Sequence, residues 1–101
     1  MKSSLSIFGT RYRIKYVDTV EVEDGQPYRF GQTDTIKKII EVATKDYDGR
    51  DLTSDEIEVS FFHELMHAIF FEGQYLSQNE DEPLVEWCAK CFRSLRKQGV
   101  I

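Results

Sequence analysis

A chain of 101 residues, 41% hydrophobic and 31% charged, suits one compact domain with one core and is too apolar to be disordered over most of its length. Its apolar runs are far shorter than a membrane span, and its N-terminus lacks the basic and apolar segments of a secretory signal. We therefore expect a single domain over residues 1–101 that is cytoplasmic, has reduced cysteines and has no membrane partner.

The net charge of −5 is unevenly distributed along the chain. Residues 51–101 contain 10 acidic and 4 basic residues. No Lys or Arg occurs between Asp51 and Ala89, the stretch that contains both histidines. Such a field attracts a cation and repels phosphate backbones, so we expect no nucleic-acid partner.

The first two predicted elements are strands, over residues 3–9 and 11–22. From Tyr12 to Tyr16 apolar and basic residues alternate, which is the period of a half-buried strand. The step around Gly9 suits a tight turn between the two strands. These residues indicate a β-hairpin at the start of the domain.

The next stretch, residues 23–35, is rich in turn-forming residues, Gly31 among them, and is predicted to be an irregular loop. Residues 36–43 could form a helix or a strand by propensity alone. The segment is short and contains the β-branched Ile40 and Val42, so we favour a strand.

Two helices are predicted to follow. Thr53 and Glu56 fit a capping box at the start of a helix over residues 54–72. Pro83 is tolerated in the first turn of the second helix, and Gly99 closes it. The expected apolar stripe of that helix consists of Leu84, Trp87, Cys88, Cys91, Phe92 and Leu95. Strands first and helices after indicate an α+β fold, with a small N-terminal sheet of about three strands packed on these helices.

The first helix contains the motif His63-Glu64-Leu65-Met66-His67. Residues four apart lie one turn above each other on the same helix face, so both imidazoles can reach one Zn²⁺ at about 2.0–2.1 Å. Glu64 lies about 100° around the helix from His63, close enough to meet a water on the metal. Zinc polarises a scissile carbonyl and acidifies water, while a glutamate takes the proton. The motif therefore predicts a zinc metallopeptidase with Glu64 as general base.

A catalytic zinc site needs a third protein ligand and an open fourth position. The chain has no third histidine, so the candidates are carboxylates or thiols. Glu86 is favoured because it lies one turn inside the second helix, beside Trp87, and can point inward. Glu82 lies at the acidic start of that helix, where solvation or capping is the simpler role.

His63-Glu64-x-x-His67, followed by Glu86-x-x-Ala89-x-x-Phe92-x-x-Leu95, resembles the minimal gluzincin peptidases. The resemblance is to the ImmA/IrrE type and to small phage-encoded and archaeal minigluzincins, and it covers mainly residues 54–96. It implies zinc ligation by His63, His67 and Glu86, with Glu64 as the catalytic residue. It also implies a peptide or protein substrate that adds as a strand to the sheet edge beside the active-site helix, for which residues 36–43 are the candidate.

Two alternative functions are consistent with the same residues. Cys88 and Cys91 could complete a closed structural Cys₂His₂ zinc site, although core packing is the simpler role for both thiols. No residue matches a family position that would stabilise the oxyanion, and Tyr28, Tyr47 and Tyr75 are only candidates. A zinc-binding regulatory or interaction module without efficient catalysis is therefore the other alternative.

Overall fold

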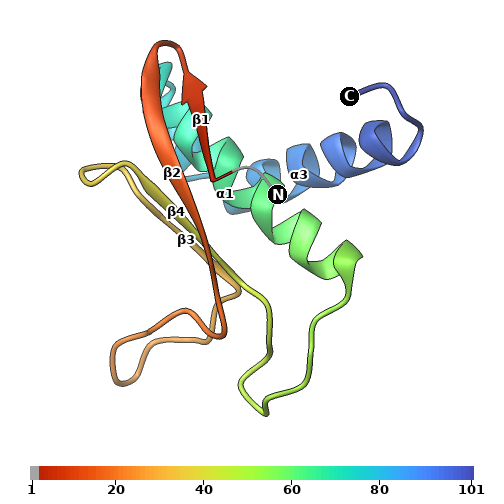
Figure 1. Cartoon of the computed structure of the whole chain (residues 1–101). Helices are drawn as coiled ribbons and strands as arrows, with labels where there is room; N and C mark the ends of the chain where they lie inside the picture. Colours follow the sequence, from red (N-terminus) through yellow and green to blue (C-terminus); the bar gives the residue numbers. More distant parts are fainter. Residues whose placement is uncertain (1–2) are drawn as a thin grey trace.

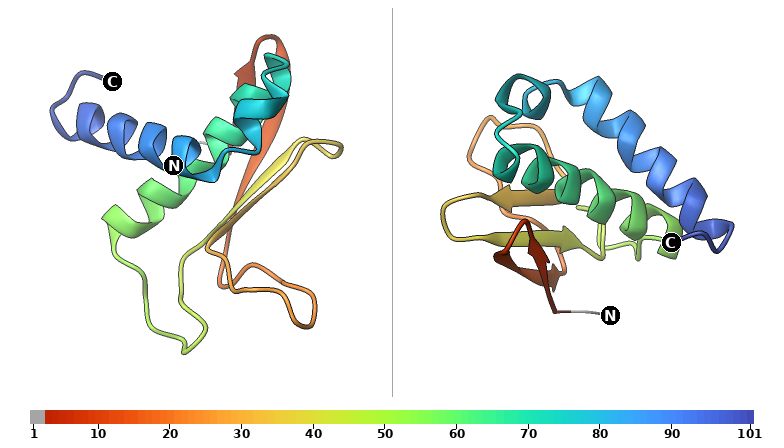
Figure 2. Two further views of the ribbon diagram at one scale, coloured as in Figure 1. Left: turned by 180° about the vertical axis from the view of Figure 1, so that it is seen from behind. Right: turned by 90° about the horizontal axis from the view of Figure 1, so that it is seen from above.

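The computed structural model describes residues 3–101 and has the expected α+β architecture (Figure 1). Four strands, rather than about three, form one mixed sheet in the order β1-β2-β4-β3, and the helices lie on one side of it (Figure 2). The elements are β1 (Ser4–Ile7), β2 (Thr10–Val17), β3 (Gly31–Asp34), β4 (Ile39–Ala43), α1 (Ser54–Glu72), α2 (Leu76–Asn79) and α3 (Glu82–Lys97).

The predicted hairpin between β1 and β2 is confirmed. Phe8 and Gly9 both have positive φ, 49° and 84°, as a two-residue turn that follows the right-handed twist of the strands requires. The second strand is shorter than predicted, because it ends at Val17 and not at residue 22. Val20 lies beyond the strand and is buried in a small cluster with Ala43 and Leu52. Val20 thus contributes to the core although it lies in a loop and not in a strand.

The prediction of an irregular loop over residues 23–35 is wrong in its last part, because β3 lies within it. β3 pairs antiparallel with β4, with Gly31 opposite Val42 and Asp34 opposite Ile39. The predicted strand over residues 36–43 is confirmed from Ile39 onward.

The place of residues 36–43 in the sheet differs from the expectation. β4 pairs with β2 on one side and with β3 on the other, so it is a central strand and cannot accept a further strand. The sheet edge that contacts α1 most is β3, which the sequence pattern did not reveal.

The helix α1 begins and ends where the sequence predicts. The side chain of Thr53 accepts a hydrogen bond from the Glu56 amide, and the Glu56 carboxylate accepts one from the Thr53 amide. At the other end Gly73 follows the helix, but the residue in the left-handed conformation is Gln74, with φ 64°. The helix packs on the sheet over a core formed by Ile7, Tyr12, Ile40, Val42 and Ala68.

The helix α3 packs against α1, and the chain ends beyond it (Figure 2). Its buried side differs from the predicted stripe, because Val85 and Ala89 are buried and Trp87 is 65% exposed. Phe92 lies on the packed side as predicted, and its ring stacks on Phe62 of α1. The stripe is therefore turned around the helix relative to the prediction. Within residues 3–101, no helix combines the length and the apolar character that crossing a bilayer requires.

Candidate metal centre

Two imidazoles lie side by side on α1, as the motif predicts. The ring centroids of His63 and His67 are 5.0 Å apart. Their side chains are 19% and 16% exposed, so each is largely buried but still accessible to solvent. The four-residue spacing in a regular helix is sufficient to bring the two rings together.

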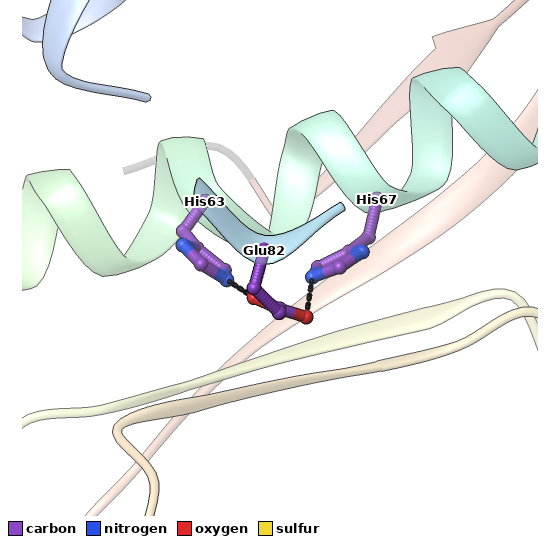
Figure 3. A group of neighbouring side chains, drawn as sticks. All are labelled: His63, His67 and Glu82. Carbon is purple, nitrogen blue, oxygen red and sulfur yellow. Dashed lines mark hydrogen bonds and ion pairs between the residues drawn. The ribbon is translucent and has the colours of Figure 1, made fainter. Parts of the chain in front are cut away.

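The third member of the group is Glu82, the first residue of α3. Figure 3 shows its carboxylate pointing between the two imidazoles. One carboxylate oxygen lies 2.9 Å from Nε2 of His63, and the other lies 3.1 Å from Nε2 of His67. One possible ligand atom from each of His63, His67 and Glu82 can be chosen so that the three atoms lie within 4.8 Å of one another. The distances of 2.9 and 3.1 Å are close to the separation of neighbouring ligand atoms around a tetrahedral zinc with bonds of about 2.0 Å.

The remaining ring nitrogens face other side chains. Nδ1 of His67 lies 2.8 Å from Oδ1 of Asn79, a carbonyl oxygen that can only accept. This partner suits the tautomer with the proton on Nδ1, which leaves the Nε2 lone pair for a metal ion. Nδ1 of His63 lies 3.4 Å from the Glu86 carboxylate. Such contacts orient metal-ligating histidines and make them better ligands.

Glu82 and Glu86, the two candidate third ligands, thus both lie beside the histidines, but they face different ring nitrogens. Glu82 faces Nε2 of both rings, and Glu86 faces Nδ1 of one. Trp87, the neighbour of Glu86, lies in solvent and not in the predicted apolar stripe, and the Glu86 side chain is 42% exposed although its carboxylate faces His63. Glu86 as a metal ligand stays a prediction, and the geometry adds Glu82 beside it.

The carboxylate of Glu64 is buried between α1 and the edge strand β3. Glu64 is 8% exposed and is the one buried charged residue in the described part of the chain. Thr33 Oγ1 lies 2.8 Å from its Oε1 and 3.0 Å from its backbone carbonyl oxygen. Burial raises the pKa of the Glu64 carboxyl above its usual range, while the hydrogen bond from Thr33 and the two nearby imidazoles oppose the rise.

Gly31 allows this close approach of strand and helix. A Cβ atom at Gly31 would lie 2.6 Å from Cγ and 2.9 Å from Oε2 of Glu64. Sequence reasoning interpreted this glycine as a loop residue and missed Thr33 and Asn79 altogether. A lone glycine within a strand often marks such a close approach, which is the signal that was available.

The other candidate residues have separate roles. Among the described residues, His63, His67 and Glu82 form the group of possible ligands that lie close enough to share one ion, and neither cysteine belongs to it. Cys88 and Cys91 are free thiols, half-buried on α3. The rings of Tyr28 and Tyr47 are stacked, with their centroids 3.9 Å apart, and the Tyr47 hydroxyl donates a hydrogen bond to the Val20 carbonyl. Tyr75 is 60% exposed.

Comparisons with protein families, with curated proteins and with solved structures yielded no match to this chain. The residues and their arrangement are therefore the basis for any functional assignment.

The donor set fits zinc. Two neutral imidazole nitrogens and one carboxylate oxygen are the ligands of many catalytic zinc sites, which keep a fourth position for water or substrate. Calcium and magnesium take mainly oxygen ligands, so two imidazoles disfavour both ions. The acidic surroundings also lower the cost of binding a divalent cation.

Proposed function

We propose that the protein is a zinc-dependent metallopeptidase of the gluzincin kind, with His63 and His67 as metal ligands and Glu64 as general base. One observation carries the proposal. Two Nε2 atoms and a carboxylate of α3 converge on one point, and the buried Glu64 carboxylate comes from the residue between the two histidines in the same helical turn.

Each residue has a distinct role in the proposed reaction. Zinc bound by this group would polarise the scissile carbonyl and increase the acidity of water. Glu64 takes the proton of the attacking water and passes it to the leaving amine. Its burial supports this role, because a carboxyl with a raised pKa is a better match to proton transfer near neutral pH.

The position of β3 supports the proposed substrate class. This strand is at the edge of the sheet and contacts α1, so its outer backbone edge is the place where an extended peptide can pair. Pairing there brings the peptide past Glu64, which contacts Thr33 of the same strand. A peptide or an extended protein segment is therefore the proposed substrate.

The direct test uses Glu64→Gln, which keeps the shape of the side chain and removes the base. Native mass spectrometry should show one zinc per chain for both the parent protein and the variant. With a peptide library, the zinc-loaded parent should cleave, and the variant should be at least about 100-fold slower. Equal cleavage rates in the two proteins would refute Glu64 as the base.

A second function, a zinc-binding module without efficient catalysis, is favoured by one observation. The Tyr28 and Tyr47 rings stack on each other, and the Tyr47 hydroxyl is already engaged by the Val20 carbonyl. The Tyr47 hydroxyl is thus already engaged and does not stabilise an oxyanion in this conformation. Zinc binding without Glu64-dependent cleavage of any library member would support this function. As a control, replacing both Cys88 and Cys91 with Ala should leave zinc bound, whereas a closed Cys₂His₂ site would lose it.

A further inference from the structure

Two residues of the edge strand β3, Gly31 and Thr33, contact the Glu64 side chain; we call them the β3 pair. Strand residues two apart lie on the same face, so both members of the β3 pair face α1. Gln32 between them points to the other face of the sheet, where it lines a small polar pocket with Lys15 and Glu41. Both members of the β3 pair thus face Glu64 from the same side, whereas Gln32 faces away from it.

The two members of the β3 pair act on the Glu64 side chain in different ways: Gly31 leaves room for it, and Thr33 contacts its carboxylate. The absence of a side chain at Gly31 leaves space that Cγ and Oε2 of Glu64 occupy. Thr33 Oγ1 contacts Oε1 of the same carboxylate at 2.8 Å. A glutamate side chain has several rotatable bonds and loses more conformational entropy than most residues when it is fixed. The hydrogen bond from Thr33, made in a space that glycine leaves open, therefore selects one orientation out of many.

Thr33 is suited to this role by its own stiffness. A β-branched side chain has few χ1 rotamers in a strand, so the hydroxyl is held in place before Glu64 meets it. The same hydroxyl lies 3.0 Å from the Glu64 backbone carbonyl, which ties the strand to the helix at this residue.

We infer that the β3 pair positions the general base: Gly31 provides the space for the Glu64 side chain, and the Thr33 hydroxyl fixes the direction of its carboxylate. The inference rests on the proposed function for its catalytic consequence. The positioning itself is a property of the folded chain, and it can be measured without metal or substrate.

The first experiment is a double-mutant cycle on the metal-free protein, with unfolding by urea as the readout. Thr33→Val keeps the shape and removes the hydroxyl, and Glu64→Ala removes the carboxylate. The unfolding constant of the double variant should depart from the product of the two single effects by about fivefold. Gln32→Ala combined with Glu64→Ala is the matched control, and its effects should multiply. If the Thr33 cycle is also multiplicative, the inference is overturned.

The second experiment separates positioning from general stability. In zinc-loaded protein, Thr33→Val should lower kcat about tenfold and leave KM and zinc content within about twofold, because the base is present but poorly oriented. Thr33→Ser should restore most of the rate. Gly31→Ala should lower kcat at least as much, since its Cβ would displace Glu64. Equal losses in Thr33→Val and Thr33→Ser would overturn the inference.

Failure of the proposed function and failure of the positioning inference give different results. If the parent protein cleaves no peptide, the proposed function fails, and the crystal structure of Thr33→Val still decides the positioning. An unchanged Glu64 rotamer in that crystal structure overturns the inference, and a displaced carboxylate supports it.

Discussion

At the scale of single residues, the two glutamates of the first turns of α3 lie on opposite sides of one imidazole. Glu82 contacts Nε2 of His63, and Glu86 lies nearer to Nδ1. The Nδ1 side of His67 is already taken by Asn79. A metal bound to His67 would therefore bind its Nε2, the atom that Glu82 also faces. Geometry favours Glu82 as the third ligand, while the E-x-x-A resemblance implies Glu86.

Matched glutamine variants decide between the two carboxylates. We expect Glu82→Gln to weaken zinc binding by more than about 100-fold, because it removes the negative charge of the carboxylate that would bind the ion. Glu86→Gln should weaken binding by only about tenfold, the usual effect of losing a carboxylate that orients a ligating histidine. Competition with a chromophoric chelator measures both affinities. The reverse order would identify Glu86 as the direct ligand.

The sequence predicted those site residues whose relation depends on helix geometry alone. His63, Glu64 and His67 are fixed relative to one another by the α-helical turn, so their spacing was sufficient. Asn79 and Thr33 lie 12 and 31 residues away in the chain from their partners. Their contacts depend on where α2 and β3 are placed by the rest of the fold, and no local pattern contains that information.

At the scale of elements, the same distinction holds. The helix α1 carries its own start signal in Thr53 and Glu56, and it was predicted to the residue. The strand β3 has no alternating apolar residues, because its sequence is Gly-Gln-Thr-Asp. It exists through pairing with β4 and through its contacts with α1, which are tertiary interactions.

The C-terminal end of α1 is attached to the sheet by Glu72. Its carboxylate accepts hydrogen bonds at 2.7 Å from the Tyr12 hydroxyl of β2 and from the Lys38 ammonium in the turn between β3 and β4. The hydrogen bond from Lys38, then that from Tyr12, lowers the pKa of the Glu72 carboxyl below its usual range. The ion pair is largely shielded, since the Glu72 side chain is 12% exposed.

This attachment makes stability depend on pH. A carboxyl whose pKa is lower in the folded state contributes stability above its unfolded pKa of about 4.3, and the contribution is lost as pH falls through the folded pKa. Glu72→Gln should cost roughly 1 kcal/mol at pH 7. The difference from the parent should shrink as pH falls below about 4.3. Urea unfolding at several pH values tests this, with Glu21→Gln, at an exposed position, as the control. A difference that stays constant down to pH 3 would contradict it.

At the scale of the whole molecule, α3 is held mainly through other helices. Its contacts are with α1 and α2, and the sheet lies on the other side of α1 (Figure 2). A metal shared by His63, His67 and a glutamate of α3 would therefore connect the last helix to the rest of the domain. Metal binding and the docking of α3 should be thermodynamically linked.

Zinc should stabilise the protein and protect α3 in particular. Free zinc at about 100 times Kd contributes about 2.7 kcal/mol, which corresponds to a rise in Tm of about 10 °C or more for a domain of this size. Hydrogen exchange should slow most at the α3 amides. The His67→Ala variant serves as the control and should show neither effect. Protection confined to α1 would mean that no ligand comes from α3.

The contacts that α1 makes along its length limit how many residues this helix can gain or lose. The helix is attached at Thr53 by its cap, at Glu64 to Thr33, and at Glu72 to Lys38 and Tyr12. Each residue turns an α-helix by about 100°, so inserting or deleting one residue between Glu64 and Glu72 would turn one attachment away from the sheet. The histidine pair would then point elsewhere or the end of the helix would detach. The number of residues between Glu64 and Glu72 is thus constrained by their two attachments, whereas the connection over residues 18–30 has no such rotational constraint.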